Sequence, residues 1–136
     1  MDPLNSDESA TLGSLKVSFY KGVPIFRKEY GFRSGSFLCI LLAQGDTVDD
    51  LRHEWGHTVQ QGILGALKYG LTIGIPSWQD LGNKDYYDRP WEVTADYYGG
   101  VEGRVHSNHN ISAGIAYLAL VAILGIMGTL FLIGEY

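Results

Sequence analysis

The stretch His53-Glu54-Trp55-Gly56-His57 is the part of this 136-residue chain that decides its fold and its chemistry. It has the pattern H-E-x-x-H and lies where a helix is predicted. Residues four apart lie on the same face of a helix, so both histidines can reach one metal ion, with Glu54 beside them. That arrangement is what a zinc-dependent hydrolase needs. The alternative is a pair of solvated histidines on an ordinary amphipathic helix.

The residues before and after the motif favour a helix with a defined start. Thr47, followed three residues later by Asp50, resembles a capping box in which Asp replaces the usual Glu or Gln. We predict a helix over residues 48–61 that ends at Gly62. The face predicted to pack on a sheet lies apart from the two histidines and carries Leu51, Trp55, Thr58 and Val59.

The first third of the chain predicts strands. Residues 14–20, 24–30 and 35–43 are rich in β-branched, aromatic and leucine side chains and are separated by glycines. Residues 37–42 are continuously apolar, which predicts a strand covered on both faces. With the helices, this pattern indicates an α+β fold with a small antiparallel or mixed sheet of about three strands. Residues 1–13 are polar and acidic, and we expect them to be disordered.

A second helix is predicted over residues 89–98. Asp88 is a plausible N-cap, Pro90 suits the first turn, and Gly99-Gly100 ends the helix. This helix carries Glu92 and, one turn later, Asp96.

A catalytic zinc ion needs a third protein ligand and an open position for water. The candidates in this chain are Glu92, Asp96, His106 and His109, and we select Glu92 because its helix can cross the motif helix. Asp96 could then accept the free ring N–H of a ligand histidine. The alternatives are a solvated helix face for the two carboxylates and surface positions for the two later histidines, either of which could instead stabilise an oxyanion.

With Glu92-Val93-Thr94-Ala95-Asp96 downstream, the HEWGH motif resembles the gluzincin metallopeptidases, whose pattern is H-E-x-x-H followed by E-x-x-x-D. The longer runs RHEWGHTVQ and YYDRPWEVTADYYGGV also resemble small bacterial zincin-like domains. The resemblance covers roughly residues 34–101. It implies that His53, His57 and Glu92 bind zinc, that Glu54 is the catalytic base, and that Asp96 hydrogen-bonds a ligand histidine.

The chain departs from the gluzincin pattern in two ways. His57 and Glu92 are 35 positions apart, more than in thermolysin-like members, so the intervening segment must fold back. No clear equivalent of the residue that stabilises the oxyanion is present, and the available substitutes are Tyr86, Tyr87, His106 and His109.

Residues 111–134 contain no charged side chain and are long enough, as one helix, to cross a bilayer. We therefore expect a single-pass C-terminal membrane anchor, residues 111–134, after a zincin-like domain over residues 14–110. All ten Lys and Arg precede the anchor, which favours a cytoplasmic domain. Small residues on the anchor permit helix packing in a homo-oligomer or a membrane complex. The apolar segment 62–78 is predicted either to line the cleft or to touch lipid.

Charge and cysteine content narrow the function classes. A net charge of −5 disfavours nucleic acid as a partner, and the lone Cys39 excludes an internal disulfide. The sequence therefore predicts a membrane-anchored zinc metallopeptidase whose substrate is a peptide or protein. The alternatives are an inactive metal-binding membrane adaptor and a small subunit of a membrane complex.

Overall fold

The computed structural model describes residues 9–12, 15–27, 34–43, 45–104, 111–125, 127–128, 131 and 134–135. Its strands precede its helices along the chain, as the predicted α+β class requires. The strands are β1 (Ser9–Leu12), β2 (Leu15–Tyr20), β3 (Val23–Arg27), β4 (Gly35–Ser36) and β5 (Ile40–Leu42). The helices are α1 (Val48–Leu64), α2 (Ala66–Tyr69), the π-helix η2 (Gly70–Gly74), α3 (Ile75–Gln79), the 3₁₀-helix η3 (Tyr86–Asp88), α4 (Pro90–Gly99) and α5 (Ile111–Ile123).

The described strands form one mixed sheet in the order β1-β2-β3-β5-β4. Neighbouring strands are antiparallel except β3 and β5, which are parallel and place Ile25 opposite Ile40. Strand β1 lies inside the segment predicted to be disordered. It is ordered as a strand because antiparallel pairing with β2 gives its backbone groups partners. Residues 1–8, the rest of that segment, lie outside the described residues.

The prediction of one continuous strand over residues 35–43 is wrong. Leu38 adopts a left-handed backbone conformation (φ 60°), so the chain reverses between β4 and β5. The turn is held from α1, because the Leu38 N–H donates to Oε1 of Gln61 at 2.7 Å. Only the β5 part is covered as predicted: Ile40 and Leu42 are fully buried, whereas Phe37 and Leu38 are exposed.

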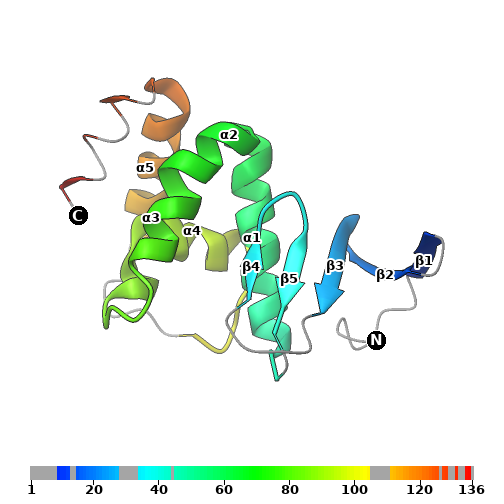
Figure 1. Cartoon of the computed structure of the whole chain (residues 1–136). Coiled ribbons are helices and arrows are strands. Elements are labelled where there is room, and N and C mark those ends of the chain that lie inside the picture. Colours follow the sequence, from blue (N-terminus) through cyan, green and yellow to red (C-terminus); the bar gives the residue numbers. More distant parts are fainter. Residues whose placement is uncertain are drawn as a thin grey trace.

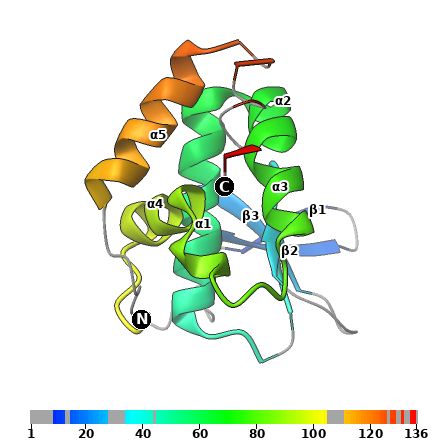
Figure 2. The ribbon, with the colours of Figure 1, turned by 90° about the vertical axis from the view of Figure 1, so that its left-hand side faces the viewer.

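Helix α1 lies between the sheet and the remaining helices (Figure 1). One apolar cluster joins α1 to the sheet through Ile25, Ile40, Leu42 and Leu51, with Trp55 packed against it. A second cluster joins α2, η2, α4 and α5 and contains Tyr69, Ile73, Trp91, Tyr117, Leu118 and Val121. Figure 2 shows α4 and α5 on one side of α1 and α2 and α3 on the other. The sheet covers one side of α1 and α4 the other, so the central residues of α1 are buried.

Both helices of the motif form close to where the sequence predicts them. The capping box at Thr47 and Asp50 starts α1. The helix continues through Gly62 to Leu64, because Gly65 (φ 81°) and not Gly62 has the backbone conformation that ends it. Helix α4 runs from Pro90 to Gly99, but Arg89 rather than Asp88 occupies the N-cap and makes no side-chain cap bond.

Helices α1 and α4 cross in backbone contact because each has a glycine at the contact. A Cβ atom at Gly56 would lie 1.8 Å from the carbonyl oxygen of Ala95, and one at Gly99 would lie 1.9 Å from that of Arg52. No larger residue fits at either position unless the helices separate. Helix α5 approaches α4 in the same way, since a Cβ at Gly114 would lie 2.8 Å from a methyl carbon of Thr94.

The expected membrane-spanning helix over residues 111–134 is not found. Helix α5 has 13 residues, about 20 Å at 1.5 Å per residue. Its last turn is held by Lys68, whose ammonium donates to the carbonyl oxygens of Ala122 and Leu124. Among the described residues, no helix combines the length and apolar character needed to cross a bilayer. Placement at a membrane stays a prediction of the sequence.

The apolar segment 62–78 is helical and partly a core element. Tyr69 and Ile73 are buried against α4 and α5, which agrees with the prediction that this segment lines the interior. Its other face is exposed, with Leu67 at 72% and Trp78 at 71%. Contact of this face with lipid stays a prediction.

Replacing Gly56 or Gly99 by alanine tests the α1–α4 contact. We expect each variant to lose about 3 kcal/mol in the free energy of unfolding, because the added methyl forces two backbones apart. Urea denaturation followed by circular dichroism measures the change. Gly62→Ala is the matched control: it is also in α1, but its Cβ meets nothing within 4 Å, and it should be neutral or stabilising. Equal effects at all three glycines would contradict the assigned contact.

Candidate metal centre

Three side chains from the two crossing helices meet at one buried point. His53 and His57 come from α1 and Glu92 comes from α4. All three residues are nearly or completely buried, at 4%, 4% and 0% exposure. Buried charges and imidazoles need partners, and here each finds the other two. This is the set of residues selected as ligands from the sequence.

The distances within this group fit a zinc ion. Oε2 of Glu92 lies 3.0 Å from Nε2 of His53 and 3.3 Å from Nε2 of His57. The two Nε2 atoms are 3.1 Å apart. Tetrahedral ligands at zinc bond lengths of about 2.0–2.1 Å lie about 3.3–3.4 Å from one another. The three atoms therefore form the face of a tetrahedron that a zinc ion could bind with little rearrangement.

Asp96 fixes the ring orientation of His53. Its carboxylate accepts a hydrogen bond from Nδ1 of His53 at 2.6 Å, so the proton of the neutral ring lies on Nδ1 and the lone pair lies on Nε2. Arg104 donates to the same Asp96 oxygen at 2.7 Å. The loop that carries Arg104 is tied to the start of α1, because Gly103 donates its N–H to Asp49 at 2.8 Å. Asp96 thus takes the part that the gluzincin resemblance implies.

Gln60 does for His57 what Asp96 does for His53. Its Oε1 accepts from Nδ1 of His57 at 2.8 Å. The orientation of this amide is fixed by its other end, which donates to the carbonyl of Trp91 at 2.7 Å and to Oγ1 of Thr94 at 2.8 Å. Both histidines therefore present Nε2 lone pairs to the same point.

One carboxylate oxygen of Glu92 is held by Ser77, and the other faces the two histidines. Ser77 donates to Oε1 of Glu92 at 2.5 Å. The single proton of Ser77 is used in that bond, so its oxygen accepts from the Tyr86 hydroxyl at 2.8 Å. Oε2 is fully buried and, among the described residues, has no neighbouring donor other than the Nε2 atoms of His53 and His57, which lie 3.0 Å and 3.3 Å away. A buried carboxylate oxygen that faces two imidazole nitrogens indicates a site for a cation or a proton.

The carboxylates beside His53 favour a proton on this group when no metal is bound, because they raise the pKa of the imidazole. Burial alone lowers the pKa of His53, but hydrogen bonds to Asp96 and Glu92 outweigh it and raise that pKa to about 10. Burial likewise raises the pKa of Glu92, yet the two histidines bring it well below its usual range. Three acceptor atoms at this spacing repel one another, and either a proton or a metal ion relieves the repulsion.

Glu54 faces a small cavity beside the three donors. The cavity has a volume of about 130 Å³, and its lining includes Glu54, His57, Tyr69, Ser77 and Tyr86. Edge strand β4 borders it through Gly35 and Ser36. A carboxylate, two phenols and one of the metal donors, His57, thus share one space.

The two phenols of this cavity stay protonated at neutral pH. Burial, followed by the negative charge of nearby carboxylates, raises the pKa of Tyr69 and of Tyr86 well above the usual value of a phenol. Each can therefore donate a hydrogen bond within the cavity.

The four predicted oxyanion candidates have different outcomes. Tyr86 lines the Glu54 cavity. Tyr87 does not: its ring lies 3.8 Å below the Arg104 guanidinium and meets the edge of His53. His106 and His109 lie outside the described residues.

Four residues of the centre were not selected from the sequence. Gln60 follows the motif by three positions on the same helix face, a spacing that could have indicated it. Tyr69, Ser77 and Arg104 reach the site through tertiary packing, and no local pattern marks them.

Comparison with known proteins returned no matching family model, no curated relative and no similar solved structure. The function must therefore be argued from the geometry of the centre.

We predict that the full-length protein binds one zinc ion. His53→Ala and Glu92→Gln should reduce the bound metal to background, because each removes one of three donor atoms. Metal analysis by mass spectrometry after gel filtration measures the stoichiometry. Glu102→Gln, at an exposed carboxylate, is the control and should keep the metal. Full zinc occupancy in Glu92→Gln would show that α4 supplies no zinc ligand.

Zinc affinity should rise with pH. Zinc must displace the proton of His53, whose pKa is about 10, so affinity should increase about tenfold per pH unit between pH 7 and 9. The stabilisation that the protonated ring gives the metal-free fold has the opposite trend: it is complete below about pH 6.5 and is lost towards pH 10.

Competition with a chelator of known affinity measures this slope. Asp96→Asn removes a hydrogen bond that raises the His53 pKa, so the slope in that variant should be flatter. A wild-type affinity that does not change with pH would contradict the assigned protonation.

Proposed function

We propose that this protein is a zinc-dependent metallopeptidase that hydrolyses peptide bonds, as its resemblance to the gluzincins implies. The observation that carries the proposal is the convergence of His53, His57 and Glu92, with Glu54 in the adjoining cavity. A zinc ion at this site would supply Lewis acidity and lower the pKa of water to about 7. All remaining steps can be assigned to side chains of this chain.

Glu54 is the proposed base. It is almost completely buried, yet it lines the cavity in which a water molecule and a peptide carbonyl would meet. Its carboxylate would accept a proton from the attacking water and deliver it to the departing amine nitrogen. Gln60 and Asp96 would keep the two imidazoles in place while this proton moves.

Tyr86 is the proposed donor to the carbonyl oxygen. Its raised pKa keeps the phenol protonated, so it can donate as negative charge develops on that oxygen. In the structure this hydroxyl bonds Ser77, which in turn bonds Glu92. The phenol has a single proton, so on binding of a peptide at Glu54 it would exchange the Ser77 oxygen for the carbonyl oxygen as its acceptor.

The edge of the sheet supplies a track for the peptide backbone. Strand β4 is one of the two edge strands of the described sheet, and Gly35 and Ser36 border the Glu54 cavity. An extended peptide can add to such an edge through main-chain hydrogen bonds. This geometry would present successive peptide bonds to Glu54.

A metal-binding protein without catalysis is the second candidate function. The cavity of about 130 Å³ favours it, because ligand pockets usually enclose about 300–1,000 Å³. Under this alternative the wild type binds zinc but cleaves nothing, whereas the peptidase cleaves a fraction of any diverse peptide mixture.

We predict that Glu54→Gln retains zinc and loses peptide cleavage by a factor of about 10²–10⁴, since the general base is removed while the three donors remain. Digestion of a diverse peptide library by the zinc-loaded protein, read by mass spectrometry, measures cleavage. Tyr86→Phe should lower kcat by a factor of about 10²–10³. Its matched control is Tyr87→Phe, whose ring contacts with Arg104 and His53 do not need the hydroxyl. Unchanged cleavage in Glu54→Gln would remove the proposed base.

A further inference from the structure

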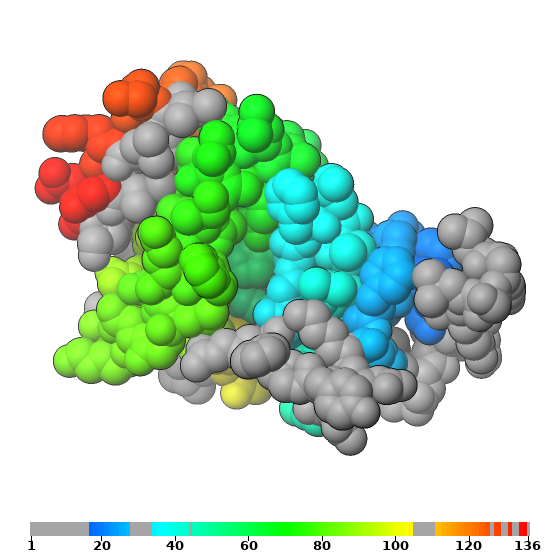
Figure 3. All heavy atoms as spheres, in the orientation of Figure 1, coloured from blue at the N-terminus to red at the C-terminus, as the bar shows by residue number. Residues whose placement is uncertain are grey.

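A second hollow lies directly beside the Glu54 cavity. It has a volume of about 400 Å³ and lies between the β4–β5 turn and the helical segment that follows α1. In the surface view the same two segments, cyan and green, flank a depression (Figure 3). Among the residues that line the hollow, none is charged. We call it the apolar groove.

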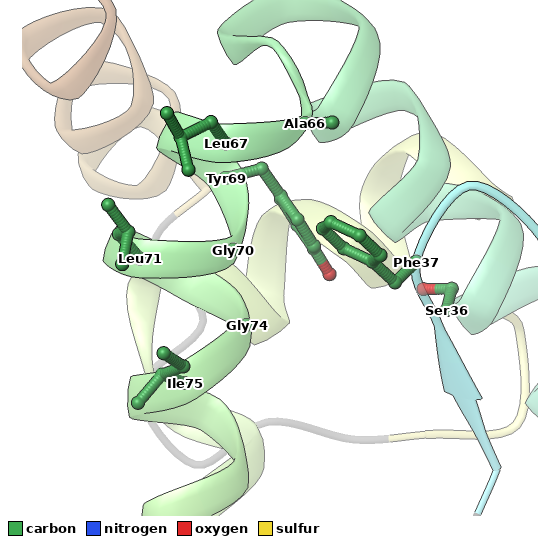
Figure 4. A pocket seen from close by; sticks show the side chains of 9 residues that line it. All are labelled: Ser36, Phe37, Ala66, Leu67, Tyr69, Gly70, Leu71, Gly74 and Ile75. Carbon is green, nitrogen blue, oxygen red and sulfur yellow. The ribbon is translucent and has the colours of Figure 1, made fainter.

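Two glycines on one face of η2 line the groove. Gly70 and Gly74 are four residues apart, and Figure 4 shows them between the rings of Phe37 and Tyr69 on one side and Leu71 and Ile75 on the other. A Cβ at Gly70 would lie 3.2 Å from the Phe37 ring, and one at Gly74 would lie 3.6 Å from the Tyr69 ring. Gly70 therefore lets the Phe37 ring lie against the helix, and the absent side chain of Gly74 leaves space next to the Tyr69 ring.

The groove and the Glu54 cavity are continuous. Ser36, Tyr69 and Gly74 line both of them. A molecule whose reacting carbonyl lies at Glu54 could therefore place a neighbouring side chain in the groove without leaving the protein surface. The Tyr69 ring forms part of the wall that both spaces share.

We propose that the apolar groove binds an apolar side chain of the peptide that is cleaved at Glu54, and so selects substrates with leucine, phenylalanine or a similar residue at one position. This proposal rests on the proposed peptidase function. A charged side chain in the groove would lose water and find no ionic partner, whereas an apolar one would cover rings and aliphatic groups. A leucine side chain should be favoured over serine by about 10- to 100-fold.

The test measures binding and cleavage separately. Zinc-loaded full-length protein is titrated with acetylated tripeptide hydroxamates in which each position in turn carries leucine, phenylalanine or serine. The hydroxamate anchors the probe at the metal, so no turnover is needed. The expected result is an affinity 10- to 100-fold higher for leucine than for serine at one position, and the same preference in library cleavage.

Two variants change the groove in opposite directions. Gly74→Leu should fill it and is compatible with the helical backbone there (φ −58°, ψ −52°), so the leucine preference should fall below about threefold. Because Gly74 also borders the Glu54 cavity, the affinity of the all-serine probe, which does not use the groove, reports whether that cavity still accepts a ligand. Phe37→Ser removes one wall and should weaken the preference as well. Leu38→Asn is the matched control, since Leu38 is the exposed neighbour in the same turn but does not line the groove. Zinc content, measured for each variant, verifies that the metal centre is intact.

The outcomes separate this proposal from the peptidase. Equal affinity for leucine and serine probes, or a leucine preference that survives in Gly74→Leu, would contradict the proposed role of the groove even if peptides are cleaved. A groove-dependent preference without any cleavage would support side-chain binding in the groove and contradict the proposed peptidase function. If the exposed face of this segment serves only to cover lipid or a second copy of the chain, the probes show no side-chain preference, which also overturns the proposal.

Discussion

The backbone contact between α1 and α4 is the constraint on which the rest of the structure depends. Gly56 and Gly99 let two helices cross so closely that a carbonyl of each would collide with any added side chain on the other. Only at this separation does a glutamate on α4 reach two imidazoles on α1. Gly56 is one of the two variable positions of the H-E-x-x-H pattern, so here the pattern carries a packing requirement as well as two donors and a base.

The centre is organised by hydrogen bonds that lie behind the donor atoms. Asp96 and Gln60 each occupy the Nδ1 side of one histidine, and Ser77 occupies one oxygen of Glu92. The remaining donor atoms, Nε2 of each histidine and Oε2 of Glu92, therefore face the same point. A ring flip or rotamer change in any of the three residues would break a buried hydrogen bond. Since Gln60 is anchored to α4 through Trp91 and Thr94, the orientation of His57 on α1 is set by the neighbouring helix. The two helices are thus joined by the same bonds that prepare the site.

The sequence predicted the local features of this molecule and missed those that arise from packing. The start of α1, helix α4 and the five residues His53, Glu54, His57, Glu92 and Asp96 follow from spacing, capping and one resemblance, and the structure brings these residues together. Apolar content alone predicted one strand over residues 35–43 and one long helix over 111–134. Neither prediction could include the left-handed Leu38, nor the Lys68 side chain that reaches α5 from 54 residues away. The sequence does not indicate Ser77 and Tyr69 either, because only the fold-back of α2, η2 and α3 brings them to the centre.

The fold-back of α2, η2 and α3 separates the residues that bind the ion from those that shape the surrounding cavity. All three metal donors come from α1 and α4, whereas the walls around them come from β4 and from the segment between the two helices. Two hydroxyls of that segment act on a donor residue: Ser77 donates to Glu92, and Tyr86 bonds Ser77. With Ser77 and Tyr86 kept, the rest of the segment could be exchanged or redesigned to accept a different molecular shape while the ion-binding scaffold stays as it is. Such modularity would let one small framework diversify in selectivity without losing its chemistry.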